Sequence, residues 1–159
     1  MPEEISLGSV TGVVHVTLDD GSEEYRFQDS HALIAIVMSQ AKPSMGLSFP
    51  TSEAEEFQIG QMSWPTGHKI QAHSHKPITR TTQSTSEVLF VRRGRVRMTL
   101  FTAEGQPLAT KDLGEGDVVA LFSGGHGFEI LEDADIVEVK QGPYTGEDEK
   151  FRFPDTDEA

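Results

Sequence analysis

The feature that most constrains this fold is a series of short apolar segments separated by turn residues at intervals of about ten residues. Turn residues recur at Asp20-Gly21, Arg92–Arg95, Ala103–Gln106 and Gly114–Asp117. The strands expected between these turns are 10–18, 25–27, 57–64, 67–75, 87–91, 96–101, 108–113, 118–122, 127–131 and 136–140. Many short strands at this spacing are typical of an all-β sandwich or barrel.

The N-terminal part of the chain predicts a β-hairpin. Residues 10–18 alternate apolar and polar side chains, which is the period of a half-buried strand. Asp20-Gly21 favours a tight turn because glycine accepts a positive φ, and Tyr25–Phe27 would form the returning strand. His15 falls on the polar face of the first strand, so we expect it to be solvated.

The next segment predicts one short helix. Residues 32–40 are mostly apolar and end before Pro43, and a polar residue is available upstream to cap a helix. The apolar run inside is continuous, so a buried strand is the alternative. We divide the chain into a hairpin-helix extension at 1–55, a barrel at 56–153 and an acidic tail at 154–159.

Composition restricts the classes of function. The chain has 159 residues, which suits one domain, and no cysteine, which excludes disulfides, thiolate metal sites and a cysteine nucleophile. Its net charge of -13 repels phosphate backbones and anionic lipids, so we expect neither a nucleic acid nor a membrane as partner. The longest apolar run, Ala32–Met38, is too short to cross a bilayer, and the acidic start Met1–Glu4 does not resemble a signal peptide. We expect a cytoplasmic protein.

Three histidines and one glutamate predict a metal site. His73 and His75 are two residues apart, so on a strand their imidazoles point to the same face. Glu87 opens the next apolar run, and His126 follows a glycine-rich turn further along the chain. Three imidazoles and one carboxylate make a ligand set for a divalent transition metal: Fe, Mn, Ni, Co or Zn.

Two alternatives to this ligand set remain open. Gln83 would supply a carboxamide ligand if Glu87 points away, although an amide binds metal more weakly. The four side chains would otherwise form a hydrogen-bonded polar network without metal. His68 is five residues before His73, hence on the opposite face of a regular strand, and we interpret it as a surface residue.

Candidate catalytic residues follow downstream. The general base would be Glu138, Tyr144 or Glu129, in that order. Glu138 and Lys140 share one face of the last strand, because they are two residues apart. If that face is inward, both reach a cavity and Lys140 contacts the substrate; if it is outward, they pair across the surface.

A polar segment connects two of the expected metal ligands. Residues 76–86 contain no Asp or Glu, although the whole chain has 26 acidic and 13 basic residues. We hypothesise that this segment covers the open metal positions and that Arg80 binds a carboxylate or phosphate of the substrate. A polar surface loop is the alternative interpretation.

These residues carry a resemblance to the cupins. Gly67, five residues, His73-x-His75, then Glu87, six residues and Gly94 resemble the first cupin motif, and 116–126 resembles the second. Eleven residues separate His75 from Glu87 where the family usually has three or four. Phe122 stands where proline is usual, and one residue is missing before His126.

The resemblance covers residues 56–153 and implies a fold and a partner. The segment 137–144, Val-Glu-Val-Lys-Gln-Gly-Pro-Tyr, is similar to a bacterial cupin-fold metalloprotein family found with surface-polysaccharide genes. The implied fold is the cupin-type double-stranded β-helix, a jelly-roll barrel. Small cupins commonly pair by strand exchange, so the resemblance also implies a homodimer.

Two classes of function follow. The first is a metal-dependent enzyme, of the isomerase or dioxygenase type, that acts on a small oxygen-rich molecule such as a sugar or a carboxylic acid by Lewis-acid or oxygen chemistry. The second is a cupin that binds a small-molecule ligand as a sensor without turnover. Some sugar-isomerase cupins work without metal, so a metal-free enzyme is a further alternative. The fold by itself does not choose among them.

Overall fold

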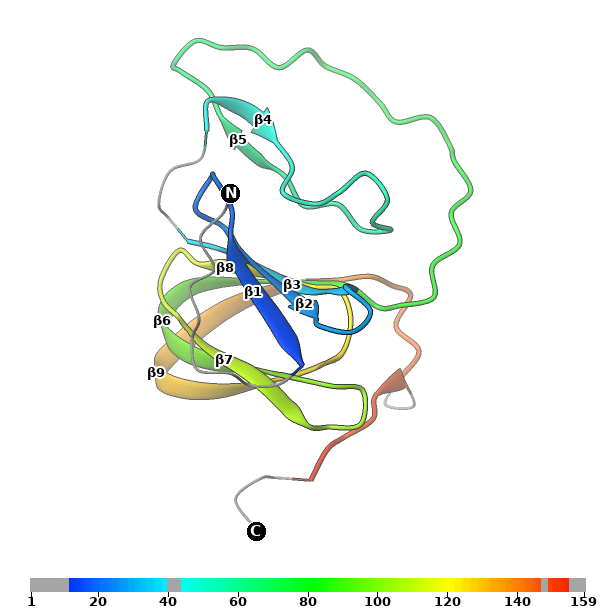
Figure 1. Ribbon diagram of the computed structural model, residues 1–159. Helices are drawn as coiled ribbons and strands as arrows, with labels where there is room; N and C mark the ends of the chain where they lie inside the picture. Colours follow the sequence, from blue (N-terminus) through cyan, green and yellow to red (C-terminus); the bar gives the residue numbers. More distant parts are fainter. Residues whose placement is uncertain (1–11, 40–43, 147–148, 155–159) are drawn as a thin grey trace.

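The computed structural model describes residues 12–39, 44–146 and 149–154, and this part of the chain is all-β (Figure 1). No α-helix occurs among these residues. The strands are β1 (Val13–Thr17), β2 (Glu23–Phe27), β3 (Leu33–Met38), β4 (Gly46–Ser48), β5 (Gln61–Ser63), β6 (Glu87–Phe101), β7 (Pro107–Leu113), β8 (Val118–Leu121) and β9 (Gly125–Lys140). The acidic tail predicted at 154–159 lies outside the described residues, apart from Pro154.

Seven strands form one antiparallel sheet, in the order β1-β2-β3-β8-β6-β7, with β9 paired to β6. β6 is long enough to have different neighbours along one edge: residues 87–90 pair with β8, and residues 96–101 pair with β7. β9 follows the other edge of β6 along most of its length. The two remaining strands, β4 and β5, form a separate two-stranded sheet.

β6 bends at Gly94 without ending there. The sequence predicted a turn at 92–95 between two separate strands, 87–91 and 96–101, and this prediction is wrong. The β6–β9 register shifts three times between Val91 and Val96, which is the mark of β-bulges. Gly94 adopts a φ of 83° and lies so close to β9 that a Cβ atom would be 2.1 Å from the Asp133 carbonyl oxygen. A bulge turns the strand while its pairing continues, so the turn residues mark a bend.

The expected helix at 32–40 is also wrong. Residues Leu33–Met38 form β3, which lies between β2 and β8, and all six side chains are buried. A strand covered on both faces has a continuous apolar sequence, which has no period of two to distinguish it from a buried helix. The alternative of a buried strand is the one that the structure adopts.

The predicted N-terminal hairpin is present, with β1 and β2 antiparallel and Gly21 at a φ of 83°. His15, however, is not solvated. Its ring stacks on Tyr25 with 4.5 Å between centroids, and its Nε2 lies 3.6 Å from a Glu23 carboxylate oxygen. Lys111 of β7 also contacts Glu23, at 2.6 Å. Since β2 and β7 lie near opposite ends of the strand order, the sheet curls until its ends meet through side chains.

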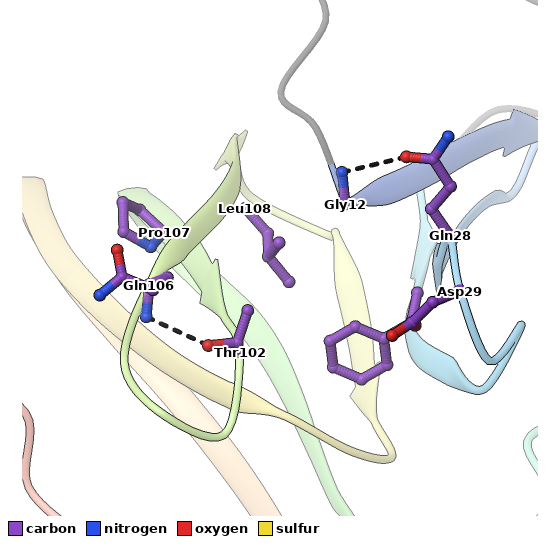
Figure 2. Close-up of a pocket in the computed structure, with 8 residues that line it drawn as sticks. Gly12, Gln28, Asp29, Thr102, Gln106, Pro107 and Leu108 are labelled. Carbon is purple, nitrogen blue, oxygen red and sulfur yellow. Dashed lines mark hydrogen bonds between the residues drawn. The ribbon is translucent and has the colours of Figure 1, made fainter.

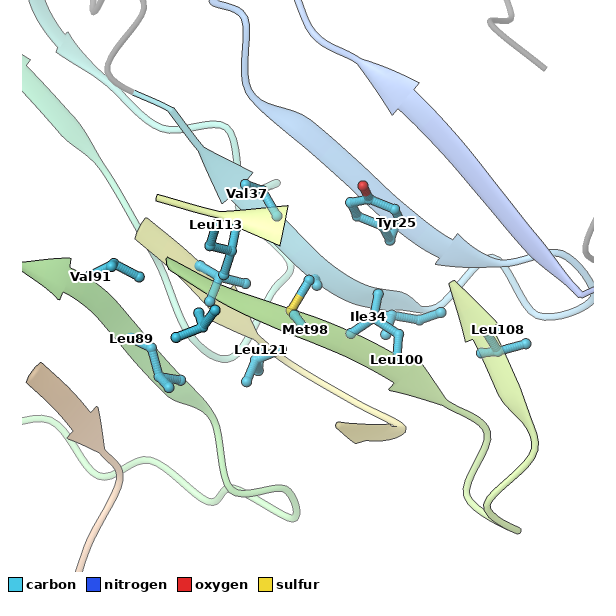
Figure 3. Close-up of a cluster of buried hydrophobic side chains, with 13 residues drawn as sticks. Tyr25, Ile34, Val37, Leu89, Val91, Met98, Leu100, Leu108, Leu113 and Leu121 are labelled. Carbon is cyan, nitrogen blue, oxygen red and sulfur yellow. The ribbon is translucent and has the colours of Figure 1, made fainter. Parts of the chain in front are cut away.

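The curled sheet encloses the main hydrophobic core (Figure 3). Its buried members are Tyr25, Ile34, Ala35, Val37, Leu89, Val91, Val96, Met98, Leu100, Leu108, Leu113, Val119 and Leu121. We call the face of the sheet that carries them the inner face. A second, smaller cluster, Leu33, Ile36, Met38, Ala120 and Phe122, lies on the outer face. Each fully buried aliphatic side chain contributes about 1.5–3 kcal/mol to stability, so the inner cluster dominates.

The segment between the two sheets differs from expectation. The predicted strand 57–64 is reduced to β5, which pairs with β4 and not with the main sheet. No strand is assigned between residues 64 and 86, so the expected strand 67–75 is absent from the described structure. Figure 1 shows this segment as a long arc beside the sheet.

No helix in the described part of the chain is long and apolar enough to span a membrane.

Candidate functional site

Glu87 and His126 meet at one end of the curled sheet. Glu87 is the first residue of β6, and His126 is opposite Leu100 near the other end of the same strand. These two positions on β6 would be about 43 Å apart on a straight strand. The bend at Gly94 folds the β6–β9 pair back, so that His126 Nε2 lies 3.0 Å from Glu87 Oε2.

The Glu87 carboxylate is held in its charged form. The hydrogen bond that His126 donates is the largest influence, and it lowers the pKa of Glu87. Burial opposes this effect, because removing a carboxylate from water disfavours its charge. The positive charges of Lys140 and Lys150 lower the pKa further. The result is an anionic oxygen donor beside an imidazole.

A cavity of about 970 Å³ opens at this pair. Its volume is at the upper end of the range for sites that bind small molecules. The lining residues come from the end of the 64–86 segment, from β6 and β9, from the turns that follow β6 and precede β9, and from the C-terminal residues: Thr85, Glu87, Leu89, Phe101, Ala103, Gly124, Gly125, His126, Gly127, Phe128, Glu138 and 149–154. Polar and apolar surface both face this space, as a site for an oxygen-rich molecule requires.

The C-terminal residues 149–154 form a strap along the cavity. Glu149 accepts hydrogen bonds from Lys140, at 3.0 Å, and from the Thr145 hydroxyl. Phe153 packs on Phe101, with ring centroids 5.6 Å apart, and fills space beside Gly125. A side chain at Gly125 would collide with the Phe153 ring, so the glycine admits the strap.

His73 and His75 lie apart from this pair. Their rings meet edge to face with 5.3 Å between centroids, and both residues are exposed. His73 Nδ1 donates a hydrogen bond to the Gln71 carbonyl at 2.9 Å. Within the described residues no three His, Cys, Asp or Glu side chains gather closely enough to hold a metal ion. The structure thus brings the four predicted ligands together as two separate pairs.

The register of β6, β8 and β9 places Glu138 and Lys140 on the inner face. Glu138 is opposite Leu89 and Lys140 is opposite Glu87, and paired residues share a face. Glu138 lines the cavity. The Lys140 ammonium donates its hydrogen bond to Glu149 and lies 5.1 Å from the Tyr144 ring centroid. Of the two orientations left open by the sequence, the inward one is observed.

The other sequence-predicted residues lie away from the cavity lining. Glu129 is opposite Arg97, whose side chain is exposed on the outer face. Tyr144 is 67% exposed, and its ring covers the Lys140 ammonium. Arg80 and Gln83 are exposed within the 64–86 segment.

Sequence reasoning missed the strap. Lys150, Phe151, Arg152 and Phe153 all line the cavity. Two basic and two aromatic residues in succession, within a chain of net charge -13, are the signal that would have indicated a site here.

A second, smaller hollow of about 320 Å³ lies between the start of β1 and the β6–β7 turn (Figure 2). Gln28 accepts a hydrogen bond from the Gly12 amide there, at 3.2 Å, and Thr102 accepts one from the Gln106 amide, also at 3.2 Å. Asp29 is its one titratable lining residue among those described. These local bonds satisfy the polar groups of the hollow, which therefore has no evident chemistry.

The candidate site is thus the cavity beside Glu87 and His126. Comparison with protein-family models, with curated proteins and with solved structures found no match to this chain.

Proposed function

We propose that this chain is a small metal-binding cupin that acts on a small oxygen-rich molecule. The observation that carries the proposal is the Glu87–His126 contact at 3.0 Å, at the mouth of a cavity. A carboxylate and an imidazole from distant parts of the chain form half of the predicted ligand set. The curled antiparallel sheet supports the finer proposal of a cupin-type double-stranded β-helix.

The other half of the ligand set would come from the 64–86 segment. β9 has no neighbour on its outer edge among the described strands, and an unpaired edge accepts a further strand. Residues 67–75 have no strand partner of their own in the described structure. If they add to the β9 edge, His73 and His75 face the same space as His126.

The chemistry of the donor set fits a divalent transition metal. Imidazole nitrogens and a carboxylate oxygen suit Fe, Mn, Ni, Co and Zn. Because a carbonyl oxygen only accepts, the His73 contact with Gln71 requires a proton on Nδ1 and leaves a lone pair on Nε2. Ligating histidines commonly use such a backbone bond to fix their tautomer. A bound metal would supply Lewis-acid or oxygen chemistry in the cavity.

The residues around the cavity suggest how a substrate is held. Glu138 lines the cavity on the inner face, and we assign it the role of general base. Lys140, which pairs with Glu149 of the strap, and Arg80, which lies in the 64–86 segment outside the cavity lining, would move in to bind an anionic group of the substrate, such as a carboxylate. A sugar or a carboxylic acid provides the oxygen atoms that a metal and these polar groups bind.

A second function is favoured by the Glu87–His126 pair itself. The imidazole and the carboxylate satisfy each other directly, as they would in a polar network without metal. A metal-free, sugar-isomerase-like cupin or a ligand sensor would keep this pair for hydrogen bonding.

Elemental analysis of the purified protein and three variants tests the proposal. His126→Ala and His73→Ala should each lose most of the bound metal, because four ligands become three. His68→Ala is the matched control: it lies in the same segment as His73, but its ring stacks on Trp64 at 4.0 Å. It should retain the metal content of the parent protein.

The opposite result separates the two functions. If the parent protein carries no metal after reconstitution with each of the five ions, the metal-free alternative is favoured. If His68→Ala loses as much metal as His73→Ala, the assignment of His73 as a ligand is wrong.

A further inference from the structure

The strap is held to the rest of the chain at two points. At the first, Glu149 accepts hydrogen bonds from the Lys140 ammonium, at 3.0 Å, and from the Thr145 hydroxyl. At the second, the Phe153 ring packs on Phe101 with 5.6 Å between centroids. Figure 1 shows the strap, in red, beside the turn that joins β6 and β7. The residues between these two anchors are therefore held at the cavity by contacts on both sides of them.

Phe153 occupies a socket made by two glycines. A Cβ atom at Gly105 would lie 2.6 Å from the Phe153 ring, and one at Gly125 would lie 2.4 Å from it. Both distances are too short for a Cβ contact, so a side chain at either position would displace the ring. Gly105 is in the turn between β6 and β7, and Gly125 is the first residue of β9. The socket thus fixes the strap to two parts of the main sheet and makes it a wall of the cavity.

The residues between the two anchors are two bases and an aromatic ring. Lys150, Phe151 and Arg152 all line the cavity, and all three are exposed. Basic residues are scarce in this chain, which has 26 acidic and 13 basic residues. Phe151 is 93% exposed, so its ring contributes little to the core. Contact with a ligand in the cavity is the role that this position supports.

The positive charge of Lys150 acts within the cavity. It lowers the pKa of Glu87, which also lines the cavity. Lys140 differs, because its hydrogen bond to Glu149 holds the strap in place. Of these two lysines, Lys150 is the one placed to meet a ligand. A charge-assisted hydrogen bond from an ammonium is stronger than a neutral one, and carboxylate and phosphate oxygens are its usual acceptors.

The acidic residues of the lining do not oppose an anion once a metal is bound. Glu87 and Glu138 carry two negative charges into the cavity. A divalent ion at Glu87, as the metal proposal requires, would offset both. The basic side chains of the strap are then in excess, and the cavity attracts an anionic group.

We propose that the strap is the substrate-recognition element of this site and selects an acidic sugar, with Lys150 on the anionic group and the Phe151 ring against the sugar ring. The inference rests on the proposed function and narrows its oxygen-rich molecule to one with a carboxylate or a phosphate. The C–H groups on one face of a sugar ring are apolar, so they pack on an aromatic side chain while the hydroxyl groups stay hydrogen-bonded. Arg152 adds positive charge to the same wall.

Titration calorimetry of the full chain, after reconstitution with metal, tests the proposal with glucose, glucuronate and glucose-6-phosphate. The parent protein should bind an anionic probe about tenfold or more tightly than glucose, and the tighter of the two identifies the group. Lys150→Gln should lower the affinity for that probe to the level of glucose. Phe151→Ala should weaken all three probes alike. Both residues are exposed, so neither change disturbs the core. Arg92→Gln is the matched control: it also removes one positive charge, at an exposed position outside the cavity lining, and should keep the preference.

A pair of glycine variants tests the strap without changing any charge. Gly125→Ala should drive Phe153 out of its socket and remove the preference for anionic probes, although Lys150 is still present. Trypsin should also cleave after Lys150 faster than in the parent, because a released segment enters a protease more readily. Gly127→Ala is the matched control: it lies in the same strand, and its Cβ would be 3.5 Å from Phe101, an ordinary contact. It should be cleaved at the rate of the parent.

Three results would overturn the proposal. The first is a parent protein that binds neither anionic probe more tightly than glucose, and the second is a Lys150→Gln protein that keeps the preference. The third is a Phe151→Ala protein that binds all three probes as tightly as the parent, because no sugar ring then packs there. Metal content, measured on the same samples, separates these failures from that of the metal site. A parent with metal but no preference refutes the strap assignment alone. A parent without metal that still shows the preference, and loses it in Lys150→Gln, refutes the metal site alone.

Discussion

Gly94 carries the bend that brings the two ends of the β6–β9 pair together, and Gly94→Ala is expected to be strongly destabilising. Two terms contribute. A φ of 83° costs a residue with a Cβ atom about 1–2 kcal/mol. The new methyl group would also lie 2.1 Å from the Asp133 carbonyl oxygen and 2.8 Å from Ala134 Cα. Both are backbone atoms of β9, so the strand itself must shift.

The magnitude follows from adding these terms. Overpacking of this kind costs about 1–3 kcal/mol, so the sum is about 2–5 kcal/mol. A domain of ordinary stability unfolds with about 5–15 kcal/mol, so the variant loses a large fraction of it. Because the bend positions Glu87 against His126, we also expect Gly94→Ala to lose metal.

Two glycines separate the contributions. Gly146 has a φ of 98° with open space around its Cβ position, so Gly146→Ala measures the backbone term alone, about 1–2 kcal/mol. Gly114 has open space and no positive φ, so Gly114→Ala should be neutral or stabilise by up to about 1 kcal/mol. Urea unfolding of the three variants, at equal protein concentration, gives the order. A Gly94→Ala protein no less stable than Gly146→Ala would refute the close approach of β9.

Three further predictions concern ligands and pH. Arg80→Ala should weaken binding of an anionic ligand about tenfold in calorimetry while metal content is unchanged; unchanged affinity would reduce the 76–86 segment to a spacer. Dialysis at about pH 4 should remove the metal, because free imidazoles, with a pKa of about 6.5, protonate there; metal retained would count against histidine ligands. The hydrogen bond from Arg97 lowers the pKa of Asp112 in the folded protein. This contribution to stability is present above the unfolded pKa of about 3.9 and is lost as the pH falls. Arg97→Gln should therefore be less stable than the parent at pH 7 and should converge with it in acid, as thermal unfolding across pH would show.

The sequence predicted the strands whose two faces have different surroundings. β1 alternates apolar and polar residues over most of its length, and the predicted positions of β1 and β7 are confirmed within a few residues. β3 was ambiguous because it is buried on both faces, and such burial removes the period that identifies a strand. Gly94 was read as a turn, because local sequence does not distinguish a turn from a bulge that turns a strand with its pairing intact.

The candidate site was predictable to a different degree in its two halves. Glu87 and His126 lie on the paired strands β6 and β9, and the structure places His126 Nε2 3.0 Å from Glu87 Oε2. The segment that carries His73 and His75 has few apolar residues and no pairing in the described structure, so nothing in its local sequence fixes its position. Its place as a metal-binding strand stays a prediction. The environment of His15 was missed because stacking on Tyr25 depends on a neighbouring strand.

The alternation of side chains on β6 and β9 separates the cavity from the outer surface of the sheet. Glu87 and Glu138 point to the inner face, where the cavity lies, while Val88 and Val139 point to the outer face. Exposed edge strands open more readily than covered ones, because fewer contacts oppose the opening. β9 pairs only with β6 among the described strands, so its other edge is uncovered. A strand added at that edge, as the metal proposal requires, would therefore also hold Glu138 in its place in the cavity lining.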